Sequence, residues 1–362
     1  MSSSKNTISR LSSLLCQPLA FFGIGILVIL SLLCLLAWSH QPRYTNPVKI
    51  AIISDIHKCS ADTINSYNEA LVRQFVKDVD RRDTDFNMDL GDNASRRTGK
   101  CSKNADQDFA DVIRLLKTKA PLYHVLGDHD IEDANSLKTW KLITGMSKTY
   151  YSFDVRDVHI VVLDNITGDG AIHRKCSEDP SCKQLTKTYR DLLTQDQQEQ
   201  LLITKQAKEA LEERRQTIEN SRNKKVRNHG SISQKQLSWL STDLKRTNRT
   251  KVVIFSELPI FLHTRSDGKV FDIKNREALQ SILRESGKKI VSISGDTHEW
   301  GEHQEANIQY YVLGSFTVSQ GEWAYLEWGE DNFIFKREKS ILSGQGKDSS
   351  SDKGATMTTF WD

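Results

Sequence analysis

The feature that most constrains this sequence is a series of short apolar runs that each end in polar residues able to bind metals. Residues 48–54 (VKIAIIS) form a nearly continuous apolar run, typical of a strand buried on both faces, and Asp55-Ile56-His57 completes it. Later runs end at Gly91-Asp92-Asn93, Gly127-Asp128-His129-Asp130, Ser256-Glu257 and Gly295-Asp296-Thr297-His298. Because the carboxyl ends of parallel strands meet at one edge of a sheet, we expect these side chains to gather there.

The chemistry of these strand ends favours a metal centre over a set of surface turns. Carboxylates and imidazoles are strongly hydrated and costly to bury without a cation, so binding a cation is the plain reason to collect them. Gly91, Gly127 and Gly295 allow the backbone to turn sharply beside a ligand. A single Asp-x-His or Gly-Asp pair would be weak evidence, whereas a series of them at successive strand ends is strong.

The spacing of the apolar runs predicts an α/β fold. Strands are expected at 48–54, 86–90, 123–126, 252–255 and 290–293, with helices at 65–79, 109–116, 233–245 and 274–284. The alternation of the first three strands with helices predicts a parallel sheet covered by helices, and 252–255 and 290–293 are expected to be further buried strands. Residues 150–155 and 158–164 are expected to form an antiparallel pair, and 308–312, 323–328 and 332–336 are expected to be late strands of a second sheet. Ser233 and Gln236 form a capping-box pattern at the start of their helix.

The ordered motifs resemble those of the calcineurin-like metallophosphoesterase superfamily, over about residues 48–315. That family carries Asp-x-His, Gly-Asp, Gly-Asn-His-Asp/Glu, His and Gly-His-x-His in this order. Residues 149–165, 236–240 and 252–261 look most similar to the branch with cyclic-nucleotide phosphodiesterases and ADP-ribose/CDP-alcohol diphosphatases. The resemblance implies a two-sheet αββα sandwich, two divalent metal ions and a metal-bound hydroxide that attacks phosphorus.

The resemblance assigns an intact first metal site. Asp55, His57 and His298 match its terminal ligands, and Asp92 matches the carboxylate that bridges both metals. The ion expected at this site is Mn, Fe, Mg or Zn.

Two further residues match the catalytic positions of the family. His129 stands where the family has the histidine that stabilises the transition state or protonates the leaving oxygen. Asp130 stands where the family has the acid that orients this histidine. We therefore expect both residues to be catalytic.

The second metal site departs from the family at every position except the bridging one. Asp128 replaces Asn, Glu257 replaces His, and Asp296 replaces the first His of Gly-His-x-His. A site that has lost its imidazoles should prefer a hard, oxygen-binding ion such as Mg, Mn or Ca. Two divalent cations would leave the surrounding carboxylates with about one excess negative charge, which would repel an anionic substrate unless it is offset. A protonated carboxyl, a trivalent metal or nearby cations such as His263 and Arg265 could offset it.

An apolar segment near the N-terminus predicts membrane insertion. Residues 19–38 are almost wholly apolar, no Lys, Arg, Asp or Glu lies between Leu11 and Pro42, and twenty helical residues span about 30 Å. We expect a tail at 1–18 and an uncleaved single-pass transmembrane anchor (a signal-anchor) at 19–39. The alternative is a signal peptide cleaved near Ala37-Trp38-Ser39, which would give a secreted protein.

The cysteines outside the anchor region suggest disulfides. Four cysteines allow three pairings. Cys59 and Cys101 lie in loops that leave the same sheet edge, from strands that the family fold places side by side, and Cys176 and Cys182 bracket a short turn-rich loop. We expect the pairs Cys59–Cys101 and Cys176–Cys182. The alternative is four free thiols.

The orientation of the globular part follows from these cysteines. The sequences Asn165-Ile-Thr and Asn248-Arg-Thr are also glycosylation acceptors if the host glycosylates. Together with the expected disulfides they favour an oxidising, extracytoplasmic compartment for the globular domain.

Composition and charge indicate how the chain divides into domains and which partners it lacks the features to bind. With 38% hydrophobic and 27% charged residues, the chain can bury a large core, and we expect one phosphoesterase domain at 47–337. Residues 183–228 are expected to form a charged helical insertion. It is either a solvent-exposed segment without a binding role or a surface for a protein partner. Residues 338–362 are expected to be disordered. The net charge is only +3 and no basic stripe alternates with aromatics, so we do not expect binding to duplex nucleic acid.

Two functions are consistent with these patterns. The first is a membrane-anchored, metal-dependent phosphoesterase that hydrolyses a phosphomonoester, phosphodiester or pyrophosphate of a small-molecule or nucleotide-like substrate. The alternative is a non-catalytic descendant whose acidic site binds a cation such as Ca to hold a binding or scaffold surface.

Overall fold

The structure is a computed structural model of the chain, and it describes residues 46–61, 69–96, 99–132, 134–168, 226–330 and 332–342. All of these belong to the compact unit Asn46–Asp362. The expected tail at 1–18, the expected anchor at 19–39 and the Cys176–Cys182 pair lie outside the described residues. Within the part that the structure describes, no helix is both long and apolar enough to cross a membrane.

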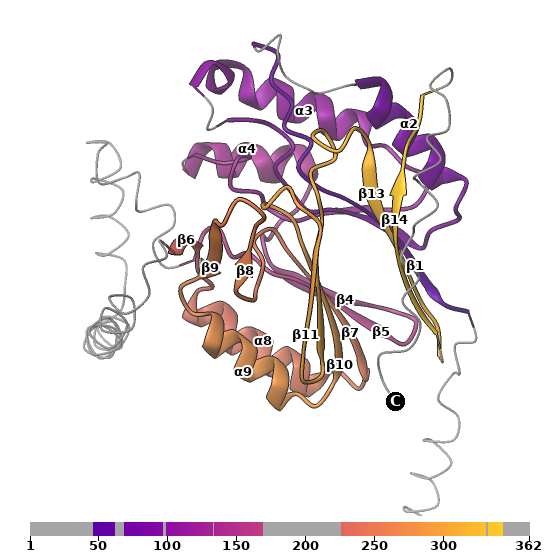
Figure 1. The fold of residues 1–362 in the computed structure, drawn as a ribbon, viewed down its shortest axis with the longest axis vertical. Helices are drawn as coiled ribbons and strands as arrows, with labels where there is room; N and C mark the ends of the chain where they lie inside the picture. Colours follow the sequence, from indigo (N-terminus) through magenta and orange to yellow (C-terminus); the bar gives the residue numbers. More distant parts are fainter. Residues whose placement is uncertain are drawn as a thin grey trace, which may run out of the picture. The chain divides into compact units, whose positions relative to one another are not determined.

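Two sheets form the centre of the unit (Figure 1). The first has the order β14-β13-β1-β2-β3, and the second has the order β11-β12-β10-β7-β5-β4. The first sheet consists of β1 (Val48–Ile53), β2 (Phe86–Asp89), β3 (Leu122–His124), β13 (Glu322–Trp328) and β14 (Phe333–Lys339). The second consists of β4 (Tyr151–Val155), β5 (Val158–Val162), β7 (Lys251–Ser256), β10 (Lys289–Ser294), β11 (Gly301–Glu305) and β12 (Ile308–Val312).

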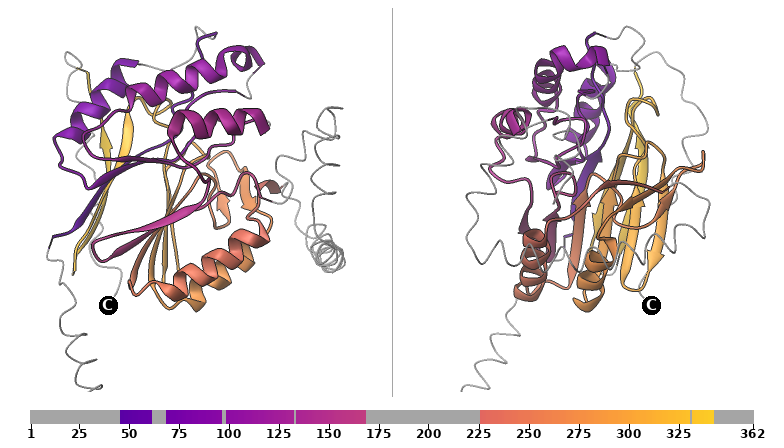
Figure 2. Two further views of the ribbon diagram at one scale, coloured as in Figure 1. Left: turned by 180° about the vertical axis from the view of Figure 1, so that it is seen from behind. Right: turned by 90° about the vertical axis from the view of Figure 1, so that its left-hand side faces the viewer.

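Helices cover the outer face of each sheet (Figure 2). α2 (Glu69–Asp80) and α3 (Ala105–Leu115) pack on the first sheet, whereas α8 (Gln234–Arg246) and α9 (Arg276–Glu285) pack on the second. The helical layers, the two sheets and the apolar core between the sheets make up the αββα sandwich that the sequence predicts.

The alternation of side chains along β1 shows why its sequence is apolar throughout. Ile50 and Ile52 point into the core between the sheets, while Ala51 and Ile53 pack against the helices. Both faces of the strand are therefore buried, and each large apolar side chain contributes about 1.5–3 kcal/mol relative to exposure.

One strand assignment from the sequence is wrong. The pair β13 and β14 was expected in the second sheet, but it belongs to the first, because β13 pairs antiparallel with β1 in a register that places Val48 opposite Trp328. β12 lies parallel to β10 in the second sheet, as expected. The antiparallel pair of β4 and β5 and the cap of α8, where Ser233 Oγ accepts from the Gln236 amide, are also confirmed.

Several short elements are not evident in the sequence. They are the 3₁₀ helix η1 (Gly99–Asn104), the helix α4 (Ala134–Thr144) and a small sheet of β6 (Val226–Gly230), β9 (Val270–Ile273) and β8 (His263–Thr264). The expected insertion at 183–228 is therefore corrected at its end, where residues 226–228 belong to a strand; residues 183–225 lie outside the described part.

The expected C-terminal boundary at 337 is also wrong. β14 continues to Lys339, Ser340 is buried, and Leu342 packs against the core beside α2. The domain thus includes residues to 342, and the rest of the expected tail lies outside the described residues.

Candidate metal centre

The expected site residues occupy the loops that follow five strands. Asp55 and His57 follow β1, Asp92 follows β2, and the segment 128–130 follows β3. From the second sheet, Glu257 follows β7, and Asp296 and His298 follow β10. The carboxyl ends of strands from both sheets thus supply the site.

A first cluster forms from the four residues expected at the first metal site. The two imidazoles meet with 2.9 Å between His57 Nε2 and His298 Nε2. Asp55 Oδ1 lies 3.6 Å from His57 Nε2 and 3.3 Å from His298 Nε2, and Asp92 Oδ2 lies 3.7 Å from His57 Nε2. Asp55, His57 and His298 thus each offer an atom to a group in which all atoms lie within 4.8 Å of one another, as ligands of a single ion must, and Asp92 lies beside His57.

The backbone at this cluster adopts an unfavourable conformation. Asp55, His57, Asp92, Asp296 and His298 all have positive φ values, between 51° and 61°. Such a left-handed residue costs on the order of 1–3 kcal/mol unless the surrounding structure fixes it. Here the backbone of the two neighbouring loops does so: His57 N donates to Asp92 O at 2.8 Å, and Asp55 N to Gly91 O at 3.2 Å.

The electrostatics of the first cluster fit a bound cation. Burial, followed by the charges of Asp55 and Asp130, raises the pKa of Asp92 well above its usual range. Burial acts in the same direction on Asp55, but hydrogen bonds and charge from His298 and His57 outweigh it and hold the pKa of Asp55 below its usual range. A divalent cation among these groups would offset the repulsion between buried carboxylates.

His129 lies at the open side of the cluster. Its backbone N–H donates to Asp92 Oδ1 at 2.8 Å, and its ring meets that of His57 edge to face at 4.9 Å between centroids. Its side chain is 26% exposed. A ring that is fixed beside the ligands and reachable from solvent suits proton transfer to a leaving group.

A second cluster contains only carboxylates. Asp92, Asp128 and Glu257 are buried, and each offers an oxygen to a group of atoms that all lie within 4.8 Å of one another. Asp296 is outside this group in the described part of the chain, although its charge contributes to the raised pKa of Asp92. The structure therefore brings two of the three expected acidic substitutions together and places the third nearby.

A comparison with protein families shows which family this chain belongs to. Residues 48–300 match the family model of calcineurin-like phosphoesterases. The chain belongs to this family. It is thus a member of a family of metal-dependent phosphoric ester hydrolases.

Comparisons with individual proteins show how distant the relatives are. A search of curated protein sequences finds no match. Among solved structures, the chain is similar to a dimetal phosphatase from Danio rerio at 18% identity and a TM-score of 0.55, covering 82% of this chain and 97% of that one. It is also similar to the purple acid phosphatase PPD1 from yellow lupin (Lupinus luteus) seeds at 12% identity and a TM-score of 0.51, covering 83% of this chain and 52% of that one. These likenesses show a shared fold.

For this member of the calcineurin-like phosphoesterases, the structure gives Asp130 a different role from the expected one. Its carboxylate accepts hydrogen bonds from the backbone amides of Asp92, Asn93, Ala94 and Gly127 at 2.8–3.3 Å, and none of its described contacts is to the imidazole of His129. Burial, then the charge of Asp89, raises its pKa to about 7 against the opposing effect of these amides. Asp130 ties together the two loops that carry Asp92 and His129.

The two residues expected to act as cations, Arg265 and His263, lie in different environments. Arg265 Nη1 donates to Thr297 O at 3.3 Å, beside the ligand His298, and its guanidinium also pairs with Asp267 and Glu299. His263 is buried against the rings of Phe261 and Phe271, and burial lowers its pKa. Burial therefore disfavours the charged form of His263, and its expected role as a cation stays a prediction.

One supporting residue was missed by the sequence argument. Asp89 is fully buried at the end of β2, where it accepts from Asn93 Nδ2 at 2.7 Å and from Gly91 N at 3.0 Å, and its carboxylate lies 2.8 Å from His124 Nδ1. It shapes the turn that presents Asp92. A carboxylate inside an otherwise buried strand is the signal that could have revealed it.

Proposed function

We propose that this chain is an active metal-dependent phosphoesterase that hydrolyses a phosphomonoester, phosphodiester or pyrophosphate of a small-molecule or nucleotide-like substrate. The observation that carries the proposal is the group of Asp55, His57 and His298, whose atoms lie within 4.8 Å of one another, with Asp92 and His129 beside His57. This arrangement supplies a cation site and an adjacent proton donor, which together suffice for phosphate ester hydrolysis.

The first cluster would hold one divalent ion. Asp92 would serve as a ligand both of this ion and of a second ion. Bound metal ions would polarise the phosphoryl oxygens and lower the pKa of a water molecule. The protein itself orients the ligands: the backbone bonds between the loops after β1 and β2 hold His57 and Asp92 in register. His129 would give its proton to the leaving oxygen, and Asp130 would keep His129 and Asp92 at a fixed separation through the backbone.

The second cluster should select a hard ion. Asp92, Asp128 and Glu257 offer oxygen only, which suits Mg²⁺, Mn²⁺ or Ca²⁺ better than Zn²⁺. The ion at the first cluster would be Mn, Fe, Mg or Zn, because that cluster includes two imidazoles. Arg265, close to His298, is the cation that would meet the substrate phosphate.

The test measures hydrolysis by the full-length protein after its metals have been removed and replaced with Mn²⁺, Mg²⁺, Fe²⁺ or Zn²⁺. We expect turnover of at least one class among phosphomonoesters, phosphodiesters and pyrophosphates, and its loss in Asp92→Asn but not in Glu277→Gln, an exposed helical control. The absence of turnover with every metal and every class would contradict the proposal.

The acidic second cluster favours one other candidate, a non-catalytic protein that binds a cation to hold a binding surface. Three buried carboxylates bind Ca²⁺ well but repel an anionic phosphate. This candidate predicts tight Ca²⁺ binding and Ca²⁺-dependent melting without hydrolysis, so the same assay with a melting curve separates the two functions.

We also propose that residues 19–39 anchor the protein to a membrane by a single span, with the globular unit outside the cytoplasm. The support is the length of this charge-free apolar run and the Cys59–Cys101 disulfide, which forms and persists in oxidising compartments. Cleavage after the apolar run would instead yield a secreted enzyme.

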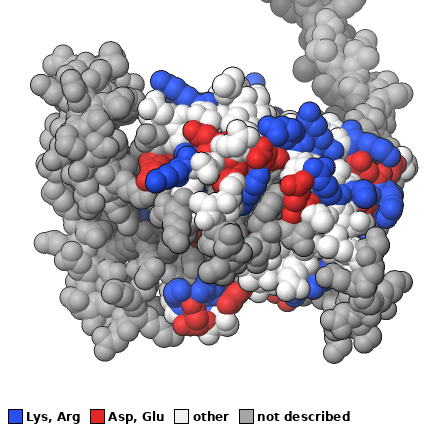
Figure 3. Space-filling model, turned by 90° about the horizontal axis from the view of Figure 1, so that it is seen from above, with Lys and Arg blue, Asp and Glu red and all other residues white. Residues whose placement is uncertain are grey.

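Residues 183–225 remain a candidate surface for a protein partner. Basic and acidic side chains are mixed on the face in Figure 3, which gives no support for duplex nucleic acid as a partner.

A further inference from the structure

We propose that the Cys59–Cys101 disulfide positions the metal ligand His57, so that the oxidation state of this bond sets the metal affinity of the first cluster. The inference rests on the proposed function only in that the first cluster binds a metal ion. It goes further by assigning to a cysteine pair that touches no ligand atom a control over the dimetal centre.

The loop that carries His57 runs beside the loop after β2. His57 N donates to Asp92 O and Lys58 N donates to Asn93 O, both at 2.8 Å. In return, Ser95 N donates to Lys58 O and Ser95 Oγ donates to His57 O, both at 3.0 Å. These bonds make a short parallel ladder that continues from the sheet into the site.

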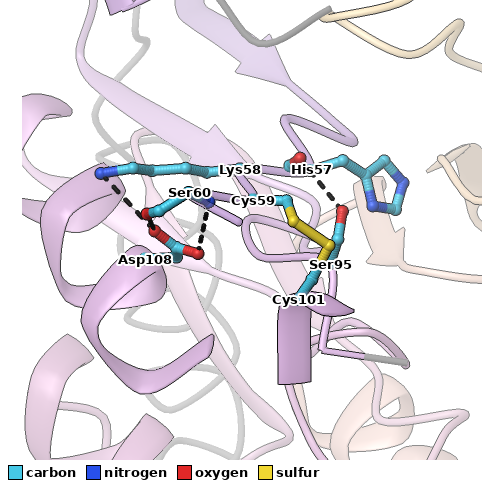
Figure 4. Close-up of a disulfide and its surroundings, with 7 residues drawn as sticks. All are labelled: His57, Lys58, Cys59, Ser60, Ser95, Cys101 and Asp108. Atoms are coloured by element: carbon cyan, nitrogen blue, oxygen red, sulfur yellow. Dashed lines mark hydrogen bonds and ion pairs between the residues drawn. A yellow bond between two sulfur atoms is a disulfide. The ribbon is translucent and has the colours of Figure 1, made fainter. Parts of the chain in front are cut away.

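The outer end of this loop is attached to helix α3 and to η1 (Figure 4). Cys59 is joined to Cys101 of η1 across 42 residues of sequence. Ser60 N donates to Asp108 Oδ2 at 2.9 Å, and its hydroxyl bonds the other oxygen of the same carboxylate. Lys58 Nζ reaches Asp111 on the next turn of α3 at 2.7 Å.

The disulfide is the one covalent link in this attachment among the described residues. His57 is in the left-handed region, with φ 51°, and such a residue persists only where its surroundings over-determine it. Hydrogen bonds can exchange with water when the loop opens, whereas the disulfide cannot. With the bond broken, the loop of His57 and the loop of Asp92 can separate, and a metal ion must then order both of them on binding.

The coupling is reciprocal by linkage, and the burial of the disulfide ties its reduction to opening of the loop. Cys59 is 5% exposed and Cys101 is 4% exposed, so a reductant reaches the sulfurs only when the loop opens. A metal ion that holds His57 in place keeps the loop closed. By linkage, the factor by which reduction weakens metal binding equals the factor by which metal binding disfavours reduction.

The reductant in this proposal is a dithiol. It breaks the Cys59–Cys101 bond through a mixed disulfide, and two electrons and two protons pass to the cysteines, which become thiols. The dithiol itself becomes a disulfide.

The experiment compares Mn²⁺ affinity in four forms of the full-length, metal-stripped protein. They are the wild type, Cys59→Ala/Cys101→Ala, His57→Ala, and Leu283→Ala, which truncates a buried side chain of α9 on the second sheet. His57→Ala identifies the phase of the titration that belongs to the first cluster. We expect the cysteine double variant to lower the Mn²⁺ affinity of that phase at least tenfold. The Mn²⁺ affinity of the acidic cluster should change less than threefold. Leu283→Ala should lower the melting temperature but leave the Mn²⁺ affinities of both clusters unchanged. This control distinguishes a loss of ligand positioning from a general loss of stability.

The reciprocal measurement decides the matter if the double variant does not fold. The equilibrium constant for reduction of the wild-type disulfide by a dithiol should fall at least tenfold when saturating Mn²⁺ is present. An equal reduction equilibrium with and without Mn²⁺ would overturn the proposal, as would wild-type Mn²⁺ affinity in a folded double variant, and neither result would touch the proposed hydrolysis. A wild type that binds no metal would instead remove the proposed function.

Discussion

At the scale of single residues, the candidate metal centre concentrates backbone strain. Among the described residues, nine non-glycine residues have positive φ, and five of them belong to the centre: Asp55, His57, Asp92, Asp296 and His298. Asp55, His57 and Asp92 are held there by hydrogen bonds between loops rather than by their own preference, and clusters of such residues mark functional sites. The strain fixes the direction of each ligand before any ion arrives, which reduces the ordering that metal binding requires.

The first prediction concerns His129. Replacing it with Ala should reduce kcat by about 10²–10⁴, because general acid catalysis contributes that much, while the number of bound metal ions stays the same. Steady-state kinetics and metal analysis of the same samples check this. The matched control is His303→Ala, an exposed histidine on β11, which should keep wild-type kcat. Undiminished kcat in His129→Ala would remove the assigned role.

The second prediction concerns the charge of the acidic cluster. Glu257→Gln keeps the shape of a buried side chain but removes one negative charge beside Asp92 and Asp128. We expect Mg²⁺ and Ca²⁺ affinity to fall at least tenfold and inorganic phosphate to inhibit more strongly, since repulsion of the anion is relieved. Calorimetry and phosphate inhibition measure the two effects. If both constants match those of the control Glu277→Gln, the cluster does not bind an ion through Glu257.

At the scale of elements, a charged clamp holds α8 on the second sheet. His159 of β5 lies 2.6 Å from Asp154 of β4 and 2.9 Å from Asp243 of α8, and Arg249 Nε donates to Asp154 at 3.2 Å. Burial opposes protonation of His159, but the two carboxylates outweigh it and raise its pKa above 6.5. Burial likewise opposes ionisation of Asp243, and its bonds, that to His159 foremost, lower its pKa.

The third prediction follows from the sign of these shifts. A raised pKa means that the contribution of His159 to stability is complete below pH 6.5 and is lost as the pH rises through the folded-state value. The melting temperature of the wild type should therefore exceed that of His159→Gln at about pH 6, and the difference should shrink by about pH 9. The control Leu244→Ala, a core truncation on α8, should give a difference that does not depend on pH. A constant difference for His159→Gln would contradict the clamp.

The same elements show what the sequence could and could not predict. The positions of the candidate ligands were predictable, because each follows an apolar run that is typical of a buried strand. The contacts of Asp130 were not predictable, because backbone amides have no sequence signature. The sheet of β13 depends on pairing with β1 across most of the chain, and no local pattern records that. Helix α4 was missed because it buries only Ser136 and Trp140, which leaves little periodicity to detect.

At the scale of the whole molecule, the centre lies where two halves of the chain meet. The first sheet contributes Asp55, His57 and Asp92, and the second contributes Glu257 and His298. The first sheet is itself closed by β13 and β14, so the first and last described strands support the same ligands. Neither half alone can assemble the first cluster, which means that the metal centre forms only in the complete sandwich.

The fourth prediction concerns the proposed membrane span at 19–39. Twenty apolar residues satisfy the length of a bilayer core, and an arginine near the middle costs about 2.5–3.5 kcal/mol on insertion scales. The full chain should therefore stay in the membrane fraction after carbonate extraction, whereas Val28→Arg/Leu32→Arg and a chain that begins at Asn46 should appear in the soluble fraction. The control Ser349→Arg/Ser350→Arg adds the same charge near the C-terminus and should remain with the membranes. Because the double arginine variant changes only the apolar run, a membrane-bound result for it would assign attachment to another part of the chain. A wild type that is soluble at the size expected for cleavage near Ser39 would show instead that the run is a signal peptide.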